Sequence, residues 1–173
     1  EHREPVPDAL AQEAELAEPF DLVAVSFSKG LGAPGGSLLA GRRDLVAAAA
    51  RQRRMLGGAM RQTGFYAAAA LFAVEHHRAR LAEDHTNARR LAEALAASPL
   101  VRIDLATVQT NIVVFHLPAT LALDAPTLSA NARARGVLVN AFGPRTVRAV
   151  THLDVTQAQC ERAAVVLAQL LAG

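Results

Sequence analysis

Residues 27–37 read Phe27-Ser28-Lys29-Gly30-Leu31-Gly32-Ala33-Pro34-Gly35-Gly36-Ser37, and this glycine-rich stretch contains the only lysine of the 173-residue chain. Lysine and arginine together number 18, so the other 17 basic residues of this kind are arginines. Arginine replaces lysine as a surface charge, but only an amine can lose its proton in a desolvated site and act as a nucleophile. Two interpretations follow for Lys29: a lysine that forms a Schiff base with pyridoxal phosphate (PLP), or a solvated loop residue.

Short apolar segments flank this stretch on both sides. Residues 22–27 predict a strand buried on both faces, and residues 37–40 predict a second strand that ends at Gly41. The lysine therefore follows the C-terminal end of a strand, where glycines let the backbone approach a ligand closely. Upstream, residues 8–18 have helical spacing, with Asp8 as the N-cap.

Helical patterns dominate the segment that follows the second strand. Residues 44–55 predict a helix that Gly57 and Gly58 end. Residues 60–98 predict a long alanine-rich helical stretch with a break near Glu83 and Asp84. The segment up to residue 84 thus supplies two strands and long helices to an α/β domain.

Beyond residue 84 the pattern changes to short strands between shorter helices. Thr156 and Gln159 have the spacing of a capping box and begin a last helix, whose apolar face contains Cys160 and Leu167. We expect an α/β protein with two parts: residues 1–84 belong to a large domain, and residues 85–173 form a small α+β domain. The strands expected in the small domain are residues 101–104, 111–116, 137–140 and 147–151, and its first helix covers residues 125–135, with Gly136 after the helix end.

Composition narrows the class of protein. The chain is 51% hydrophobic with a mean hydropathy of +0.19, which is typical of a globular protein. A single cysteine, Cys160, excludes an intramolecular disulfide and a cysteine-based zinc cluster, and it favours the cytoplasm. No apolar run reaches the length of a membrane span. The net charge of +2 and the 4% aromatic content argue against nucleic-acid binding.

Arginines are the candidates for binding anions. Arg54 and Arg61 flank the Gly57-Gly58 turn, where guanidinium groups and backbone N–H groups at a helix start near Met60 could bind a phosphate. Arg148 lies in an expected strand and is suited to a bidentate pair with a substrate carboxylate, as is its neighbour Arg145. The alternative for each is a solvated surface residue. That role is the more frequent one for a strand arginine such as Arg145 or Arg148, and we prefer it for the remaining arginines of residues 42–53.

Other polar residues have plainer interpretations. His76, His77 and His85 suggest a metal site, but only helical positions three or four apart face each other, so we interpret them as helix-surface residues. Cys160 is expected to be a buried core thiol. Asn111 either caps a turn or lines a site, and the sequence does not decide between these roles. No metal site is predicted.

Five segments, in order, resemble the low-specificity L-threonine aldolases. Residues 20–37 resemble the segment around the PLP lysine of that family. Residues 53–64, Arg-Arg-Met-Leu-Gly-Gly-Ala-Met-Arg-Gln-Thr-Gly, are similar to its Arg-Lys-Met-x-Gly-Gly-Gly-Met-Arg-Gln segment. Residues 80–88 match an Arg-Leu-x-Glu-Asp-His-x-Asn-Ala helix, residues 110–111 a Thr-Asn pair, and residues 147–156 a Val-Arg-x-Val-Thr-His-x-Asp-Val-Ser stretch.

The resemblance implies a fold-type I PLP enzyme with a mainly parallel sheet in its large domain and a smaller C-terminal domain. It implies cleavage of L-threonine or L-allo-threonine to glycine and acetaldehyde, with related β-hydroxy-α-amino acids also accepted, and assembly as a homodimer or homotetramer. Lys29 would bind the cofactor aldehyde, Ser28, Arg54 and Arg61 would help to bind the cofactor, and Arg148 would hold the substrate carboxylate. The alternatives are another β-eliminating lyase or racemase on this scaffold, or a non-catalytic homologue.

The chain also departs from the family pattern. Arg54 stands where the family often has lysine, Ala59 replaces a third glycine, and Gly35 replaces a usual valine. The family's phosphate-binding loop, its ring-stacking histidine and its Asp-x-Ala/Gly-Ala-Arg motif have no counterpart in these residues. We therefore expect residues 1–173 alone to bind PLP weakly and not to catalyse the reaction.

Overall fold

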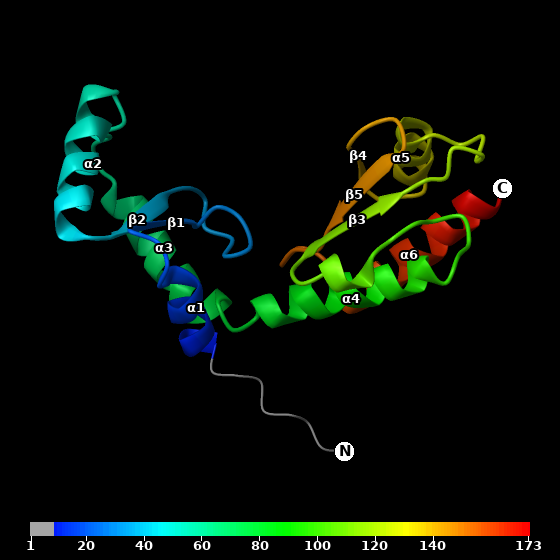
Figure 1. The fold of residues 1–173 in the computed structure, drawn as a ribbon, viewed down its shortest axis with the longest axis horizontal. Coiled ribbons are helices and arrows are strands. Elements are labelled where there is room, and N and C mark those ends of the chain that lie inside the picture. The colour runs from blue at the N-terminus through cyan, green and yellow to red at the C-terminus, as the bar shows by residue number, and fades with distance from the viewer. Residues whose placement is uncertain (1–8) are drawn as a thin grey trace, which may run out of the picture. The chain divides into compact units, whose positions relative to one another are not determined.

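The computed structural model describes residues 9–173, which form two compact units that divide between His77 and Arg78 (Figure 1). The domain boundary expected after Asp84 stays a prediction, but the helix break expected near Glu83 and Asp84 is wrong. The break in the helical segment instead lies at residues 78–80, and Glu83 and Asp84 occupy the first turn of the next helix. Carboxylates are stabilised there by the positive end of the helix dipole, which explains why they follow the break.

The described part of the first unit, residues 9–77, contains three helices and a two-stranded sheet: α1 (Ala9–Ala17), β1 (Leu22–Ser26), β2 (Ser37–Gly41), α2 (Arg43–Met55) and α3 (Gly64–His77). β1 and β2 pair antiparallel, from Leu22 opposite Gly41 to Ser26 opposite Ser37. The expected N-cap, Asp8, lies outside the described residues. The prediction of one long helical stretch over residues 60–98 is wrong about where helix begins and where it is interrupted. The first helix there, α3, begins at Gly64 and ends at His77.

The prediction that the first strand is buried on both faces is wrong for the described residues. Two of the five β1 residues are exposed and the other three are half-buried, and β2 is exposed along its whole length. The reason is topological: β1 and β2 form a sheet of two strands, with too few neighbours in residues 9–77 to cover both faces. Both sheets within residues 9–173 are antiparallel, so the parallel pairing that the resemblance implies is not seen there.

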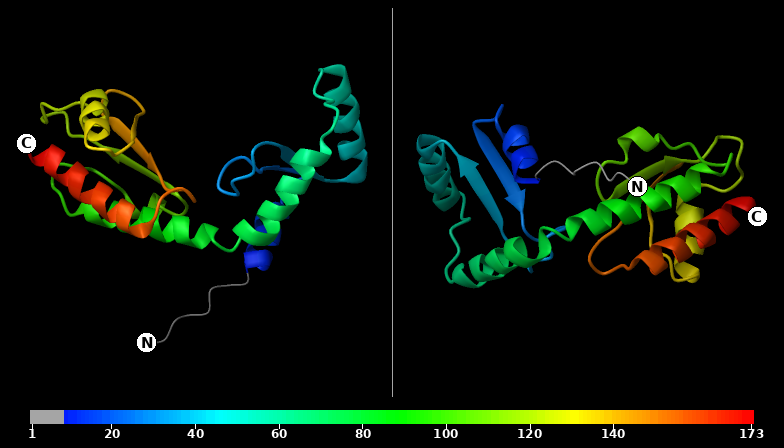
Figure 2. Two further views of the ribbon diagram at one scale, coloured as in Figure 1. Left: turned by 180° about the vertical axis from the view of Figure 1, so that it is seen from behind. Right: turned by 90° about the horizontal axis from the view of Figure 1, so that it is seen from below.

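The second unit packs helices against a three-stranded antiparallel sheet in the order β3-β5-β4 (Figure 1). Val113, Phe115 and Val147 of this sheet are fully buried and pack with residues of α4 and α6. α4 and α6 contact each other and run side by side in the views of Figure 2. The elements are α4 (Leu81–Ala96), a 3₁₀ turn (Leu105–Thr107), β3 (Ile112–His116), α5 (Ala125–Ala134), β4 (Asn140–Ala141), β5 (Thr146–Val150) and α6 (Gln157–Ala172).

Local sequence signals explain several of these boundaries. The capping box at the start of α6 is confirmed: the Gln159 backbone N–H donates to the Thr156 hydroxyl, and the Thr156 backbone N–H donates to the Gln159 side chain. Gly136 follows α5 with a φ of +78°, as expected for a left-handed helix end. The strand expected at residues 101–104 is reduced to one bridge, between Arg102 and His116, and the strand expected at residues 137–140 begins only at Asn140.

Candidate functional site

Lys29 lies at the tip of the connection between β1 and β2. The Phe27 N–H donates to the Gly36 carbonyl (3.1 Å) and the Ala33 N–H donates to the Phe27 carbonyl (2.9 Å), which closes the connection. Within it, the Gly32 N–H donates to the Lys29 carbonyl (2.8 Å), so residues 29–32 form a hydrogen-bonded turn. Gly32 has a φ of +72°, a conformation that favours glycine. Lys29 and Ser28 are exposed on this fixed backbone, so both side chains are accessible to a ligand.

Helix α3 supports the same turn. A Cβ atom at Gly35 would lie only 2.8 Å from Tyr66 Cε1, so the Tyr66 ring occupies the space that a side chain at residue 35 would need. Gly35 is one of the departures from the family pattern, and a side chain there would require the Tyr66 ring to move. At the other end of α3, His77 contacts the Leu31 carbonyl.

Arg54 and Arg61 also belong to the first unit, between α2 and α3. Arg54 lies in the last turn of α2, and Gly57 ends that helix with a φ of +77°. Arg61 lies three residues before the first residue of α3, so the expected helix start near Met60 is wrong and Arg61 is a loop residue. Both arginines are exposed. By contrast, Arg42 pairs with Asp44 at 2.8 Å on the surface, as expected for a structural arginine.

Arg148 occupies the middle of the central strand of the second unit. Its cross-strand neighbours are Val114 on β3 and Asn140 on β4. The guanidinium lies 5.7 Å from the centre of the Phe142 ring. Its Nε is buried and has no hydrogen-bond partner among the described residues. An unsatisfied buried donor on a cation is costly, and an anionic ligand would satisfy it.

Arg145 differs from Arg148 although the sequence suggested the same two roles for both. Its guanidinium donates to the carbonyls of Leu121 (2.6 Å), Leu123 (3.0 Å) and Ala119 (3.4 Å). These bonds tie the loop before α5 to the start of β5. Arg145 is therefore a structural residue, and Arg148 is the arginine with capacity for a ligand.

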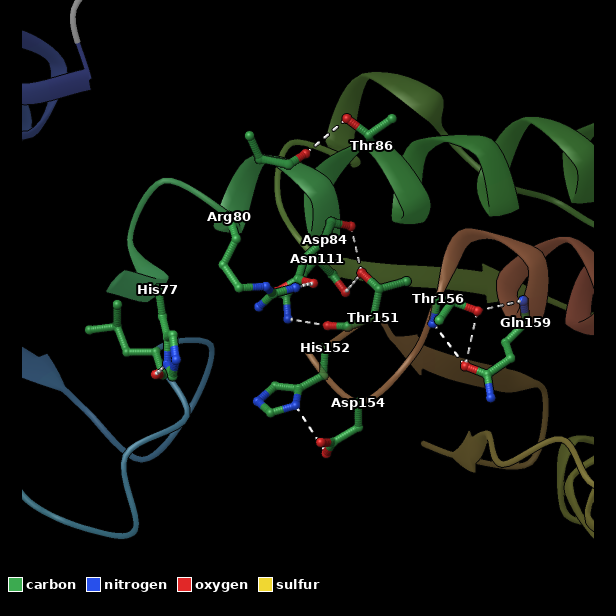
Figure 3. Close-up of polar contacts among 12 residues, drawn as sticks. His77, Arg80, Asp84, Thr86, Asn111, Thr151, His152, Asp154, Thr156 and Gln159 are labelled. Atoms are coloured by element: carbon green, nitrogen blue, oxygen red, sulfur yellow. Dashed lines mark hydrogen bonds and ion pairs between the residues drawn. The ribbon is translucent and has the colours of Figure 1, made fainter. Parts of the chain in front are cut away.

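A buried polar network connects α4 to the sheet of the second unit (Figure 3). Arg80 donates two hydrogen bonds to the carboxylate of Asp84, at 2.5 Å and 3.3 Å, and the Asp84 side chain is 1% exposed. The Thr151 hydroxyl donates to the Asp84 backbone carbonyl at 2.6 Å. Asn111 donates its side-chain amide to the Thr151 carbonyl at 2.8 Å. The network resolves the role of Asn111, which the sequence left open.

Sequence reasoning missed this network, although its signal was present. Arg80 and Asp84 belong to the segment at 80–88, Asn111 to the Thr-Asn pair, and Thr151 to the segment at 147–156. Three of the segments that carry the family resemblance therefore meet at one place, and their shared role there is to fix the sheet on α4.

We predict that Thr151→Val destabilises the protein by about 1–2 kcal/mol, because it removes a buried hydroxyl donor while it keeps the side-chain shape. Urea denaturation measures the free energy of unfolding. Thr86→Val is the matched control: the Thr86 hydroxyl bonds the Ala82 carbonyl on the exposed face of the same helix (2.8 Å), and its loss should change stability by less than about 0.5 kcal/mol. Equal effects of the two substitutions would contradict the role given to Thr151.

The remaining candidates have structural roles. Cys160 is buried, and burial raises the pKa of its thiol, which confirms the core interpretation and disfavours a thiolate nucleophile. Within residues 9–173, no group of three or more histidine, cysteine or acidic residues could hold a metal ion. In the same part of the chain, no helix combines the length and the apolar character needed to cross a membrane.

The structure gathers the predicted site residues into two sets. Ser28, Lys29, Arg54 and Arg61 belong to the first unit, and of these only Ser28 and Lys29 lie in the connection between β1 and β2. Arg148 belongs to the second unit. The first set offers an amine, a hydroxyl and two guanidinium groups, which suit an aldehyde and a phosphate, and the second offers one guanidinium, which suits a carboxylate.

Comparison with known proteins agrees with this chemistry. A solved structure of a provisionally assigned aromatic amino acid beta-eliminating lyase/threonine aldolase from Exiguobacterium sp. 255-15 has a TM-score of 0.71 over 90% of this chain and 46% of that one, at 23% identity. That likeness shows the fold, which is the fold-type I architecture of PLP-dependent enzymes. The mixed α/β class is thereby confirmed.

Residues 9–118 match the beta-eliminating lyases, and the chain belongs to this family. Its relatives include the low specificity L-threonine aldolase of Escherichia coli O157:H7, which is 43% identical over 147 residues, covering 84% of this chain and 41% of the relative. Low-specificity L-threonine aldolase 1 of Arabidopsis thaliana is 36% identical over 142 residues, covering 82% and 40%. The resemblance is thus confirmed, and the chain spans about two fifths of the length of these relatives.

Proposed function

We propose that this protein is part of a PLP-dependent aldehyde-lyase that cleaves L-threonine or L-allo-threonine, and related β-hydroxy-α-amino acids, to glycine and an aldehyde. The observation that carries the proposal is Lys29, the only lysine of the chain, exposed on a hydrogen-bonded turn. The named function of the relatives is threonine aldolase, and this supports the choice of reaction.

Four residues of the first unit carry the chemical groups that binding of PLP requires, namely Ser28, Lys29, Arg54 and Arg61. Its amine would bind the aldehyde carbon of PLP, and the Ser28 hydroxyl would donate to the bound cofactor. Arg54 and Arg61 would pair with the phosphate, for which their guanidinium groups are suited. When bound, PLP supplies an electron sink for the charge that develops at Cα as the Cα–Cβ bond breaks.

Arg148 would bind the substrate carboxylate. Its buried Nε has no hydrogen-bond partner within residues 9–173, and a carboxylate offers two acceptors that a guanidinium binds in a fixed orientation. Such binding would fix the orientation of the Cα–Cβ bond. Holding a reacting bond in the productive orientation lowers the barrier to its cleavage. In the reaction the β-hydroxyl group loses its proton, the aldehyde leaves, and Cα takes up a proton to give glycine. We assign no residue of this chain to either proton transfer.

The test is product analysis with the full-length protein, PLP and L-threonine or L-allo-threonine as substrate. The proposal predicts glycine and acetaldehyde in equal amounts. Ammonia with a keto acid would instead indicate another β-eliminating lyase, and an inverted amino acid would indicate a racemase. The absence of any product with bound PLP would indicate a non-catalytic homologue.

We predict that Arg148→Lys raises KM for L-threonine by about 10- to 100-fold, because a bidentate charged pair is replaced by a single ammonium contact. Steady-state kinetics measures KM, and circular dichroism measures folding and the melting temperature. Arg145→Lys is the control, since Arg145 bonds only backbone carbonyls in the described contacts. It should lower the melting temperature and leave KM within about twofold of the wild-type value. A raised KM in Arg145→Lys together with an unchanged KM in Arg148→Lys would contradict the roles given to the two arginines.

Location and assembly complete the proposal. The single cysteine, Cys160, suits a reducing compartment, and we propose a cytoplasmic protein. We also propose a homodimer or homotetramer, by analogy with the family. Light scattering of the full-length protein measures the oligomeric state, and a monomer with full activity would contradict this part of the proposal.

A further inference from the structure

His77, the last residue of α3, contacts the turn that bears Lys29. Its Nδ1 lies 2.7 Å from the Leu31 carbonyl oxygen, and the contact is partly buried (Figure 3). A carbonyl oxygen only accepts, so Nδ1 carries the proton and the imidazole donates. The hydrogen bond therefore fixes the tautomer of His77 and joins α3 to a residue 46 positions earlier.

The orientation of the His77 ring is held from its own helix. The Phe72 ring meets it edge to face, with centroids 5.5 Å apart and planes at 90°. The adjacent His76 behaves differently: it stacks on Phe72 and its Nδ1 contacts the Phe72 backbone carbonyl at 2.9 Å, within α3. Of the two neighbouring histidines, His77 is the one that reaches the lysine turn.

The bond acts on a particular peptide group. The Leu31 carbonyl and the Gly32 N–H belong to one planar unit, so fixing one end fixes the other. The Gly32 N–H is the donor to the Lys29 carbonyl at 2.8 Å. His77 thus holds the peptide that closes the turn at Lys29.

We infer that His77 is a positioning residue for Lys29: its hydrogen bond to Leu31 sets the turn from which the lysine amine reaches the cofactor. The inference rests on the proposed function, because it takes Lys29 as the cofactor lysine. The sequence favoured a helix-surface residue over a metal ligand for His77, and the structure adds the contact of its half-buried ring with Leu31.

The experiment uses the full-length protein and two readouts. The first is the rate at which PLP forms a borohydride-reducible adduct at Lys29, followed by peptide mass spectrometry. The second is the exchange rate of the Gly32 amide hydrogen without PLP. We expect His77→Leu to slow adduct formation about fivefold, the equilibrium effect of one net hydrogen bond, and to speed Gly32 exchange by a similar factor.

Conservative variants separate positioning from general stability. His77→Asn keeps an N–H donor at the δ position and should restore both rates to within about twofold of wild type. His77→Gln has a similar polar group placed one atom further out and should not. His76→Leu, the matched control, should leave both rates unchanged. If His77→Leu does not fold, the comparison of His77→Asn with His77→Gln still decides the inference.

The outcomes distinguish this inference from the proposed function. Wild-type rates in both His77→Leu and His77→Gln would overturn the inference. Failure of the wild-type protein to form any adduct at Lys29 would instead overturn the proposed function, and the exchange rates would still show whether His77 fixes the turn.

Discussion

Lys29→Arg is expected to lower the turnover of L-threonine by a factor on the order of 10³ or more, the scale of loss when a covalent group of an active site is removed. The charge is kept, so the loss isolates the amine: a guanidinium does not deprotonate and cannot bind an aldehyde covalently. The turn should persist, because its described backbone hydrogen bonds do not involve the lysine side chain. Steady-state kinetics and the cofactor absorbance above 400 nm, which reports the bound aldehyde, measure the effect.

Arg43→Lys is a suitable control for this substitution. Arg43 is exposed at the first residue of α2, and the change adds a second lysine to the first unit without touching the turn. Activity and cofactor absorbance should stay at wild-type values. Activity retained by Lys29→Arg would mean that the amine is not part of the site, whatever the family resemblance suggests.

Arg80→Ala is expected to destabilise the protein by about 3–5 kcal/mol, because it leaves the buried carboxylate of Asp84 without its paired cation. The Asp84 side chain is 1% exposed and that of Arg80 is 21% exposed. A buried carboxylate that has lost its paired cation is an uncompensated charge, which costs free energy. Urea denaturation at pH 7 measures the loss.

Two further variants test the physical cause of that loss. Glu93→Ala removes the acid of the exposed pair between Arg89 and Glu93 on the same helix, where side chains are about half exposed, and should cost less than about 0.5 kcal/mol. The double variant Arg80→Met with Asp84→Leu replaces the buried pair by apolar groups and should be more stable than Arg80→Ala alone. A loss from Glu93→Ala as large as that from Arg80→Ala would rule out burial as the cause.

Local signals in the sequence predicted the parts of the fold that depend on near neighbours. The capping box of Thr156 and Gln159, the helix end at Gly136 and the buried face of α6 with Cys160 and Leu167 are all confirmed. Each depends on residues within a few positions along the chain, so the sequence alone is sufficient for them.

Features set by distant partners were not predictable in the same way. Arg145 and Arg148 have the same chemistry and are three residues apart, and only their tertiary surroundings separate a structural arginine from one with an unsatisfied donor. The burial expected for residues 22–27 failed for the same reason, because burial depends on what packs against a strand. The positioning role proposed for His77 depends on its contact with Leu31, 46 residues away, which the sequence does not show.

Residues 27–37 are proposed to hold the cofactor lysine of a beta-eliminating lyase. The most direct measurement is borohydride reduction of the full-length protein with PLP, followed by peptide mass mapping. Because residues 1–173 contain one lysine, a side-chain adduct within them can lie only at Lys29. We expect one reduced adduct per chain at Lys29, and we expect Lys29→Arg to abolish it. A protein that binds PLP and is reduced elsewhere, or not at all, would contradict it.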